Sequence, residues 1–364
     1  MPEEKPIEPN QTPPPPGDAV PPADGTVQPV VSSASPAPEG PKKKLIKKAD
    51  PPPPPKVKMA PPKQPFTTIV LGETEVGKTY VNIHLEIMTY VMDNLSIGKK
   101  ARKVLIYDVN NDYHNIRTLK ATPEAILAFV KQPKIEARRI IGRDPLGRPL
   151  SKEQNYENAK MIIENFVNGL VVFDDIDRYA VHSTKQDLVS MLMGNRHMGC
   201  HILISHQAWR KMSVTECENC KWIRLHRVKD QPISLPLEKQ VTLPIDLCQI
   251  ANLMVQEQYD LAHQLYDDGA GELSENKFKA ARGFFVYIDV RLAKLKGCTE
   301  ETYKRAAYKY MYMNPPVIKR EVEELIMFGK LDRKLRNEQK SQYIAMASLY
   351  AKYRKYLVLP KAAA

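Results

Sequence analysis

The sequence predicts an α/β protein built around a mostly parallel sheet. Short apolar runs with the length of buried strands alternate with longer stretches whose apolar residues recur at helical spacing. A glycine-rich turn joins the first strand-like run to the first helix-like stretch. Several runs end in acidic or amide side chains, which is typical of the carboxyl edge of a parallel sheet, where ligands bind.

The composition indicates a chain with a core and an excess of positive charge. Its 364 residues include 54 Lys and Arg against 42 Asp and Glu, a formal net charge of +12, and 43% are hydrophobic. No apolar run approaches the roughly 18 residues that span a bilayer, and no signal sequence opens the chain, so we expect no integral membrane segment. Five scattered cysteines favour a reducing compartment without disulfide bonds.

Residues 1–65 are predicted to form a disordered, proline-rich arm. They contain 21 of the 31 prolines and few of the aromatic and β-branched residues that could offset the loss of chain entropy. Runs such as Pro51–Pro55 favour polyproline II. The basic run Lys42–Lys48 could contact nucleic acid, an anionic surface or an import receptor, or the arm could be a solubilising tether.

A phosphate-binding loop (P-loop) is predicted where the folded region begins. The strand-like run Phe66–Leu71 is followed by GETEVGKT, which matches the pattern G-x-x-x-x-G-K-[ST], and then by apolar residues at helical spacing over Tyr80–Asn94. The predicted nucleotide-binding residues are Gly72, Glu73, Thr74, Glu75, Val76, Gly77, Lys78 and Thr79.

Each position of this loop has a chemical reason. The glycines let backbone N–H groups converge on phosphate, and the following helix N-terminus adds partial positive charge. Lys78 would bridge the β- and γ-phosphates, and the Thr79 hydroxyl would bind Mg²⁺. Glu73 and Glu75 are unusual beside phosphate, so we expect their side chains to point away from it. The loop therefore predicts ATP and Mg²⁺ as ligands.

A second acidic strand is predicted to complete the site. The apolar run Leu170–Phe173 ends in Asp174 and Asp175, which is the form of a Walker B strand. Asp174 would bind Mg²⁺, and Asp175 would be the general base that activates the attacking water. Because Glu is the usual residue at the base position and is one methylene longer, Asp177 stays open as an alternative base.

Further stretches continue the α/β order. One strand ends at Asp108 and another at His206 and Gln207, so these side chains are expected at the same sheet edge. Gln207 could detect the γ-phosphate, or it could simply cap its strand. The other predicted elements are strands Lys103–Asn110, His201–Ser205, Trp222–Val228 and Phe284–Val290 and helices Ser151–Asn168, Asp187–Arg196 and Ile245–Asp267.

Several motifs beyond the P-loop carry a family resemblance. They are Tyr107-Asp108 at a strand end, Tyr113, the Walker B pair, Arg196-His197-x-Gly199 before an apolar strand, and Gln207 after it. Together they resemble the FtsK–HerA superfamily of DNA-pumping ATPases, including the genome-packaging ATPases of tailless icosahedral viruses. The zonular occludens toxin-like ATPases share the last two features. The resemblance covers about residues 66–230 and implies a RecA-like P-loop NTPase fold. Asp175 and Val76 depart from the pattern.

The resemblance also implies a function. It indicates an ATP-hydrolysing translocase of double-stranded DNA, most specifically a viral genome-packaging motor, that works as a homo-oligomeric ring, taken as hexameric. It implies the host cytoplasm or the virion as location, and capsid or portal-vertex proteins as partners of the arm. In such rings an arginine of the next subunit reaches the γ-phosphate. Arg196 is the catalytic candidate, and the others are Arg138, Arg139, Arg143 and Arg210.

The remaining residues, 296–364, are predicted to form a basic helical region, so that 66–295 would be the ATPase domain. Three helices are expected, at Thr299–Met311, Val317–Phe328 and Asp332–Tyr356. Their Lys, Arg and Tyr residues could bind nucleic acid, or the tyrosines could pack inside an amphipathic bundle. Two other functions stay open: a nucleotide-switched phage or virion assembly factor that pumps no DNA, and a small-molecule kinase, for which no acceptor site is recognisable.

Overall fold

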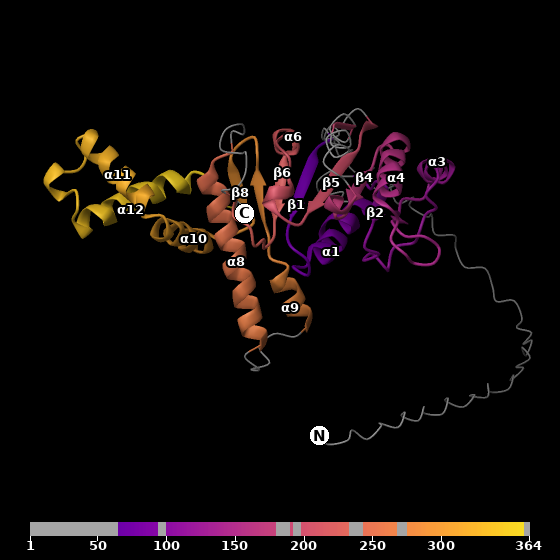
Figure 1. The fold of residues 1–364 in the computed structure, drawn as a ribbon, viewed down its shortest axis with the longest axis horizontal. Coiled ribbons are helices and arrows are strands. Elements are labelled where there is room, and N and C mark those ends of the chain that lie inside the picture. The colour runs from indigo at the N-terminus through magenta and orange to yellow at the C-terminus, as the bar shows by residue number, and fades with distance from the viewer. Residues whose placement is uncertain are drawn as a thin grey trace, which may run out of the picture. The chain divides into compact units, whose positions relative to one another are not determined.

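The computed structural model describes residues 65–93, 100–179, 190–191, 198–232, 243–267 and 275–359, all within one compact unit, Lys56–Ala364. Its centre is an eight-stranded sheet in the order β3-β2-β4-β5-β1-β6-β7-β8 (Figure 1). The strands are β1 (Thr67–Leu71), β2 (Val104–Asp108), β3 (Ala137–Ile141), β4 (Leu170–Phe173), β5 (His201–His206), β6 (Trp222–Leu225), β7 (Val286–Asp289) and β8 (Lys294–Lys296).

The sheet is mostly parallel, as the sequence predicts. In the series β3, β2, β4, β5, β1 and β6, each strand is parallel to the next. Strand β7 is antiparallel to β6, and β8 is antiparallel to β7. The central strand β1 lies between β5 and β6, and all five of its residues are buried. The loop that follows β1 is therefore flanked by the carboxyl ends of two parallel strands. The α/β P-loop NTPase-like fold is confirmed.

Helices cover both faces of the sheet. On one face, Val70 of β1 packs in the same buried cluster as Ile87 and Tyr90 of the helical segment that follows the loop. On the other face, side chains of α4 pack with β2, β4 and β5, and side chains of α8 pack with β1 and β6. Figure 1 shows α3 and α4 beside β2 and β4, and α8 near β8.

The helical elements follow the strands in the expected alternation. They are α1 (Lys78–Val81), η1 (Asn82–Ile87), α2 (Met88–Val91), α3 (Pro123–Lys131), α4 (Lys152–Asn165), η3 (Ile176–Arg178), η5 (Trp209–Lys211), α6 (Val214–Asn219), α8 (Ile245–Asp267), α9 (Glu275–Arg282), α10 (Glu300–Met313), α11 (Pro315–Met327), η7 (Arg333–Leu335) and α12 (Gln339–Arg354).

Local signals explain where some of these helices begin. Ser151 and Gln154 form a reciprocal capping box at the start of α4, and Thr122 caps α3, which has a proline in its first turn. Helices α3, α6 and α9 and strands β3 and β8 were not predicted. Of the predicted helix Asp187–Arg196, only residues 190 and 191 are among the described residues. Of the predicted arm, only Pro65 is.

Several tyrosines of the C-terminal helices pack inside the bundle. Tyr303, Tyr310 and Tyr353 are buried, and the Tyr303 hydroxyl donates to the Tyr353 carbonyl oxygen at 2.6 Å. Residues of α10 and α12 belong to the same buried cluster as residues of β1, β6 and α8. These tyrosines are therefore internal to a helical bundle. Whether 296–364 acts as a domain separate from 66–295 stays a prediction.

Several basic side chains of this bundle have acidic partners. Lys352 forms ion pairs with Glu321 and Glu324, and Arg354 donates to Glu300 at 2.5 Å. Arg305 and Lys309 both pair with Glu257 of α8. Packing and pairing within the bundle thus account for part of the pattern of alternating basic and tyrosine residues.

Two expectations from composition can be compared with the structure. All five cysteines are free, and four of them are buried. No helix among the described residues is both long and apolar enough to cross a membrane.

Candidate active site

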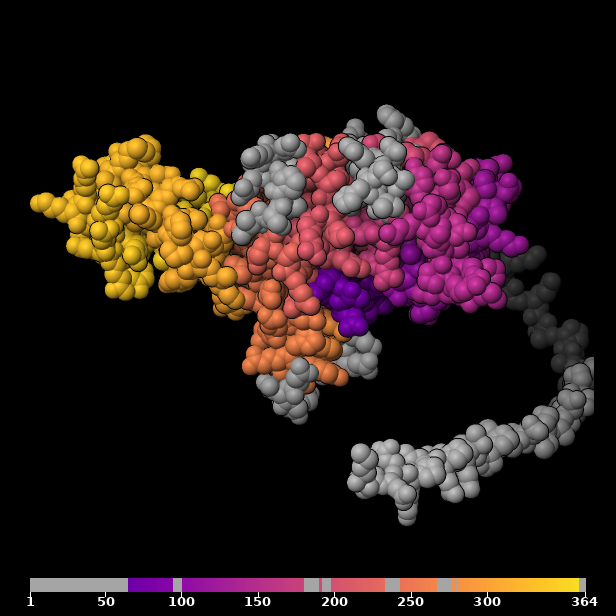
Figure 2. Space-filling view, in the orientation of Figure 1, coloured from indigo at the N-terminus to yellow at the C-terminus, as the bar shows by residue number. Residues whose placement is uncertain are grey.

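The loop between β1 and α1 is anchored to both neighbouring strands. The Gly72 N–H donates to the His206 carbonyl oxygen at 3.1 Å, and the Glu73 N–H donates to the Arg227 carbonyl oxygen at 3.1 Å. Exposed Thr74 and Glu75 show that the loop is open to solvent, and the indigo part of the chain that contains them reaches the surface in Figure 2.

Both glycines of the motif are required by the geometry. Gly77 has φ +84°, a conformation that side chains disfavour, and it directly precedes the first residue of α1. A Cβ on Gly72 would lie 2.9 Å from the His226 Cβ and 3.0 Å from a methyl group of Val76. Val76, one departure from the family pattern, is buried and forms part of this close packing.

Lys78 begins helix α1 and points back along the loop. Its Nζ donates to the Gly72 carbonyl oxygen, and its side chain is largely buried. Burial lowers the pKa of Lys78, and the nearby carboxylates of Asp175 and Asp174 oppose that shift. The ammonium group is therefore desolvated and held by a single backbone oxygen at the mouth of the loop.

Two other side chains of the loop have defined surroundings. The Glu73 carboxylate forms ion pairs with Arg227 and with Lys229, the latter at 3.4 Å, so this charge is neutralised beside the loop. Thr79 follows Lys78 in α1 and is partly buried.

Asp174 follows β4 and is buried. Burial, and next the neighbouring Asp175 carboxylate, raise the pKa of Asp174 to about 7, while Lys78 acts in the opposite direction. Burial and a neighbouring negative charge destabilise the charged form of Asp174, and a bound cation would stabilise it. No cluster of three metal-binding side chains was found among the described residues. Mg²⁺ commonly takes only one or two protein ligands and completes its shell with phosphate and water, so Asp174 and Thr79 fit it.

Asp175 is held in a defined orientation. It has φ 45°, an uncommon conformation for a residue other than glycine. Its Oδ2 accepts hydrogen bonds from the side-chain amides of Asn110 and Gln207, each at 2.9 Å, and forms an ion pair with Arg178 at 3.4 Å. Its Oδ1 is buried and has no hydrogen-bond partner. One oxygen is therefore fixed and the other is available to accept a proton.

Asp177, the alternative base, is engaged through both oxygens. Its Oδ1 lies 3.0 Å from the His206 Nδ1, and its Oδ2 accepts the Gln207 N–H at 3.3 Å. The other His206 ring nitrogen lies 3.0 Å from the Glu216 Oε1. The geometry thus favours Asp175 over Asp177 as the base.

Two of the arginine candidates lie in β3 and have partners within the chain. Arg138 pairs with Glu136 at 2.6 Å, and Arg139 pairs with the buried Asp108 at 2.8 Å. Asp108 also accepts backbone N–H groups of Asp112 and Tyr113. The Arg139–Asp108 pair therefore stabilises the end of β2, and both arginines are engaged within the chain.

The other arginine candidates differ in their surroundings. Arg143 donates to the carbonyl oxygens of Gly147 at 2.9 Å and Asn110 at 3.3 Å. Arg196 lies outside the described residues. Arg210 is exposed in η5, the short helical turn after Gln207. Among the described candidates, Arg210 is the one whose guanidinium has no ion pair or hydrogen bond within the described part of the chain.

Sequence reasoning placed His206 at the sheet edge without naming its partners, and it missed Asn110 and Glu216. Asn110 donates to Asp175, His206 contacts Asp177, and Glu216 contacts the other side of the His206 ring. Asn110 stands just beyond the carboxyl end of β2, so its position at the sheet edge could have been a signal. The partner of a buried histidine, in contrast, cannot be inferred from spacing.

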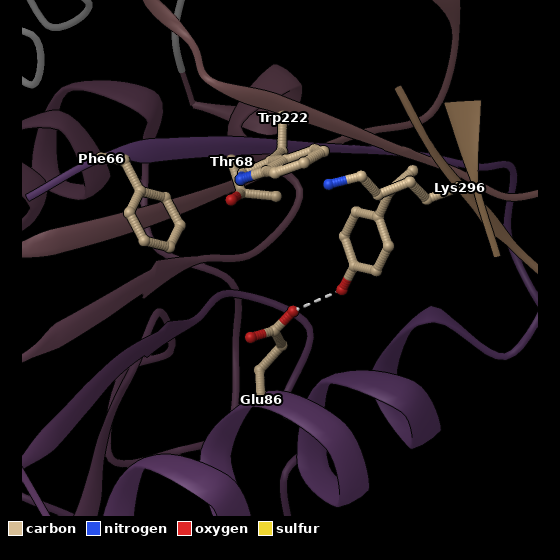
Figure 3. A pocket seen from close by; sticks show the side chains of 6 residues that line it. Phe66, Thr68, Glu86, Trp222 and Lys296 are labelled. Atoms are coloured by element: carbon tan, nitrogen blue, oxygen red, sulfur yellow. Dashed lines mark hydrogen bonds between the residues drawn. The ribbon is translucent and has the colours of Figure 1, made fainter. Parts of the chain in front are cut away.

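A separate cavity of about 300 Å³ lies at the opposite ends of the strands (Figure 3). Thr68 lines it, and Thr68 precedes Gly72 by four residues, or roughly 13 Å along an extended strand. The Glu86 carboxylate in this cavity accepts from the Tyr287 hydroxyl at 2.8 Å and pairs with Arg224 at 3.3 Å. The residues that line the cavity are Phe66, Thr68, Glu86, Trp222, Tyr287 and Lys296.

Comparison with known proteins gives similarity of fold. No protein-family model and no curated protein matches the chain. Among solved structures, the DNA-packaging ATPase B204 of Sulfolobus turreted icosahedral virus is 17% identical, with 64% of this chain and 97% of that chain covered and a TM-score of 0.37. The genome-packaging NTPase B204 of Sulfolobus turreted icosahedral virus 2, in complex with ATP-gammaS, is 14% identical over 64% and 96%, also with a TM-score of 0.37.

Two further structural neighbours are more distant. The N-terminal domain of zonular occludens toxin from Neisseria meningitidis is 18% identical over 46% of this chain and 78% of that chain, with a TM-score of 0.26. The Legionella pneumophila ATPase DotB is 12% identical over 60% and 61%, with a TM-score of 0.29. The neighbours thus include both groups that the motifs resemble. Because identities and TM-scores are this low, the ligands and partners of this chain are inferred from its own side chains.

Proposed function

We propose that this protein binds Mg²⁺ and ATP at the P-loop and hydrolyses the nucleotide. The observation that carries the proposal is the Asp175 carboxylate, whose Oδ2 is fixed by two side-chain amides while its buried Oδ1 has no partner. A general base needs one oxygen free and a fixed orientation, because proton transfer depends on geometry before pKa. The proposal rests on this carboxylate standing beside the P-loop lysine.

The side chains divide the reaction among them. Lys78 would leave the Gly72 carbonyl oxygen and contact the β- and γ-phosphates, where its charge stabilises the transferring phosphoryl group. Asp175 would take a proton from the attacking water as the water oxygen bonds to the γ-phosphorus. The bond from that phosphorus to the bridging oxygen breaks, which leaves ADP and phosphate. Mg²⁺, held by Thr79 and Asp174, would neutralise phosphate charge.

Gln207 is suited to link the base to the γ-phosphate. Its side chain reaches Asp175, and its backbone is held by Asp177. An amide in this place can respond to the presence of the γ-phosphate, because a phosphate oxygen competes for the same N–H donors. This role goes beyond a strand cap.

The finer proposal is that hydrolysis drives translocation of double-stranded DNA by a homo-oligomeric ring, as in a viral genome-packaging motor. It is supported by the motif resemblance, by the net charge of +12 and by the exposed Arg210 beside Gln207. Arg210 would act on the γ-phosphate of the neighbouring subunit; Arg196 stays a second candidate. The host cytoplasm or virion as location, and capsid or portal-vertex partners of the arm, belong to the same proposal.

One observation favours a second function. Tyr303, Tyr310 and Tyr353 are buried, and Lys352 and Arg354 are paired with acids, so the C-terminal helices contribute less free basic and aromatic surface than their sequence indicates. A nucleotide-switched assembly factor that does not pump DNA would need no such surface.

Phosphate release from ATP with and without double-stranded DNA separates these functions, with Lys78→Ala as the blank. A translocase is expected to turn over faster with DNA, and the stimulation should weaken as salt rises. Slow turnover that ignores DNA would favour the assembly factor. Turnover no higher than the blank would overturn the hydrolysis itself.

A further inference from the structure

A buried histidine links the Walker B turn to the loop that carries Gln207. His206 is the last residue of β5, and its side chain is fully buried. Its Nδ1 lies 3.0 Å from the Asp177 Oδ1, and its Nε2 lies 3.0 Å from the Glu216 Oε1. Ionised carboxylates only accept hydrogen bonds, so with both carboxylates ionised each ring nitrogen carries a proton. The two contacts then fit an imidazolium.

The electrostatics support this protonation state. Burial alone lowers the pKa of His206, but the Glu216 and Asp177 carboxylates, one on each side of the ring, raise it to about 9. Asp177 belongs to η3 and Glu216 to α6, so the cation joins two elements that are far apart in the sequence. At neutral pH the three groups form a row of alternating charge, in which His206 and Glu216 are fully buried.

The outer oxygens of the two carboxylates fix the loop between them. The Asp177 Oδ2 accepts the backbone N–H of Gln207 at 3.3 Å. The Glu216 Oε2 accepts the backbone N–H of Ser213 at 2.6 Å, within a reciprocal capping box at the start of α6. Both ends of the segment from Gln207 to Ser213 are thus tied to the same imidazolium through a carboxylate.

We propose that the His206 imidazolium is a positioning residue for ATP hydrolysis, which holds Asp177 and Glu216 so that the Gln207 amide is directed onto Asp175. The inference rests on the proposed function of the site. His206 does not contact the P-loop side chains that would bind phosphate, so its loss should slow the chemical step and leave nucleotide affinity in place.

The test compares His206→Gln with the matched control His201→Gln. His201 is a buried histidine at the other end of β5, where its ring contacts the Tyr90 hydroxyl. A glutamine at 206 has both N–H donors on one nitrogen and an acceptor oxygen on the other side, so it does not present a donor to each carboxylate as the imidazolium does. The measurements are kcat, and the Kd of a fluorescent ATP analogue.

We expect kcat of His206→Gln to fall on the order of 10–100-fold, because a small misplacement of the base is costly, while the Kd stays within about twofold. His201→Gln should keep kcat within about twofold. A folded His206→Gln variant with unchanged kcat, or with kcat and affinity lowered together, would overturn the inference. A wild-type chain that binds the analogue but turns over no faster than Lys78→Ala would instead overturn the proposed function.

A spectroscopic test covers the case in which His206→Gln does not fold. The ring nitrogens of ¹⁵N-histidine-labelled wild-type protein are observed at pH 8, and His206 is assigned from the signal that shifts in Glu216→Gln. Two protonated ring nitrogens are expected. A neutral ring at this pH would overturn the inference, because a neutral imidazole can donate to only one of the two carboxylates.

Discussion

Replacing Asp175 by asparagine isolates the chemical step. The Asn110 and Gln207 side chains both donate N–H groups to Asp175 Oδ2, so in Asp175→Asn they select the side-chain oxygen for that position. The amide nitrogen then takes the place of Oδ1 and cannot accept a proton. The change preserves shape and both hydrogen bonds while it removes the base.

The size of the effect follows from the role. General base catalysis contributes roughly 10²–10⁴-fold, so kcat of Asp175→Asn should fall by at least about 100-fold, or about 3 kcal/mol of barrier. The Asp175 charge is one of the causes that raise the pKa of Asp174, so its removal favours the charged form of Asp174 that would hold Mg²⁺. ATP affinity should therefore be retained or rise. The assay is single-turnover phosphate release beside equilibrium binding of a labelled nucleotide.

Asp177→Asn is the matched control. Both Asp177 oxygens are already engaged, by His206 and by the Gln207 backbone, so this variant should lose only about tenfold in kcat through positioning. If Asp177→Asn were the slower variant, or Asp175→Asn kept its turnover, the assignment of the base would be refuted.

Three further predictions concern the loop, the exposed arginine and pH. Gly72→Ala places a Cβ 2.9 Å from the His226 Cβ, so nucleotide affinity should fall by about tenfold or more in a binding titration, and unchanged affinity would contradict the loop geometry. Arg210→Ala should lower kcat about 10³-fold, and an equimolar mixture with Asp175→Asn should regain activity if the arginine acts between subunits; no recovery would argue against that role. The pKa of His206 is raised from 6.5 to about 9, so its stabilisation is full below pH 6.5 and is lost as pH rises to 9. That loss, at most about 3 kcal/mol, should be visible in urea unfolding at the two pH values and absent in His206→Gln; an equal loss in both would count against it.

Local patterns made the core of the fold predictable. The run Phe66–Leu71, the glycine loop and the following helix lie next to one another in the sequence, so their signals reinforce one another. Strand β3 was missed because Arg138 and Arg139 interrupt its apolar pattern. Arg139 is nevertheless buried, and its ion pair with Asp108 offsets the cost of burying its charge.

The candidate site was predictable only in part, for a physical reason. The P-loop and the Walker B carboxylates can be predicted from residue type and spacing. The hydrogen bonds that orient Asp175 come from Asn110 and Gln207, which follow two other strands. Contacts of this kind produce no periodic pattern in the sequence. The same holds for His206, whose protonation depends on two carboxylates brought to it by folding.

The C-terminal helices illustrate the opposite case, in which a strong pattern has two explanations. Tyrosines and basic residues at helical spacing suit both nucleic-acid binding and a packed bundle. The burial of Tyr303 and Tyr353, and the acidic partners of Lys352 and Arg354, favour packing for these four residues.

The most direct test of the central claim is phosphate release from Mg²⁺ and ATP by wild-type protein, with Lys78→Ala and Asp175→Asn measured in parallel for both turnover and nucleotide binding. We predict turnover in the wild type alone, with binding lost in Lys78→Ala and kept in Asp175→Asn. Turnover that survives in either variant, or a wild type that binds ATP without cleaving it, would contradict the claim that this P-loop and this carboxylate hydrolyse ATP.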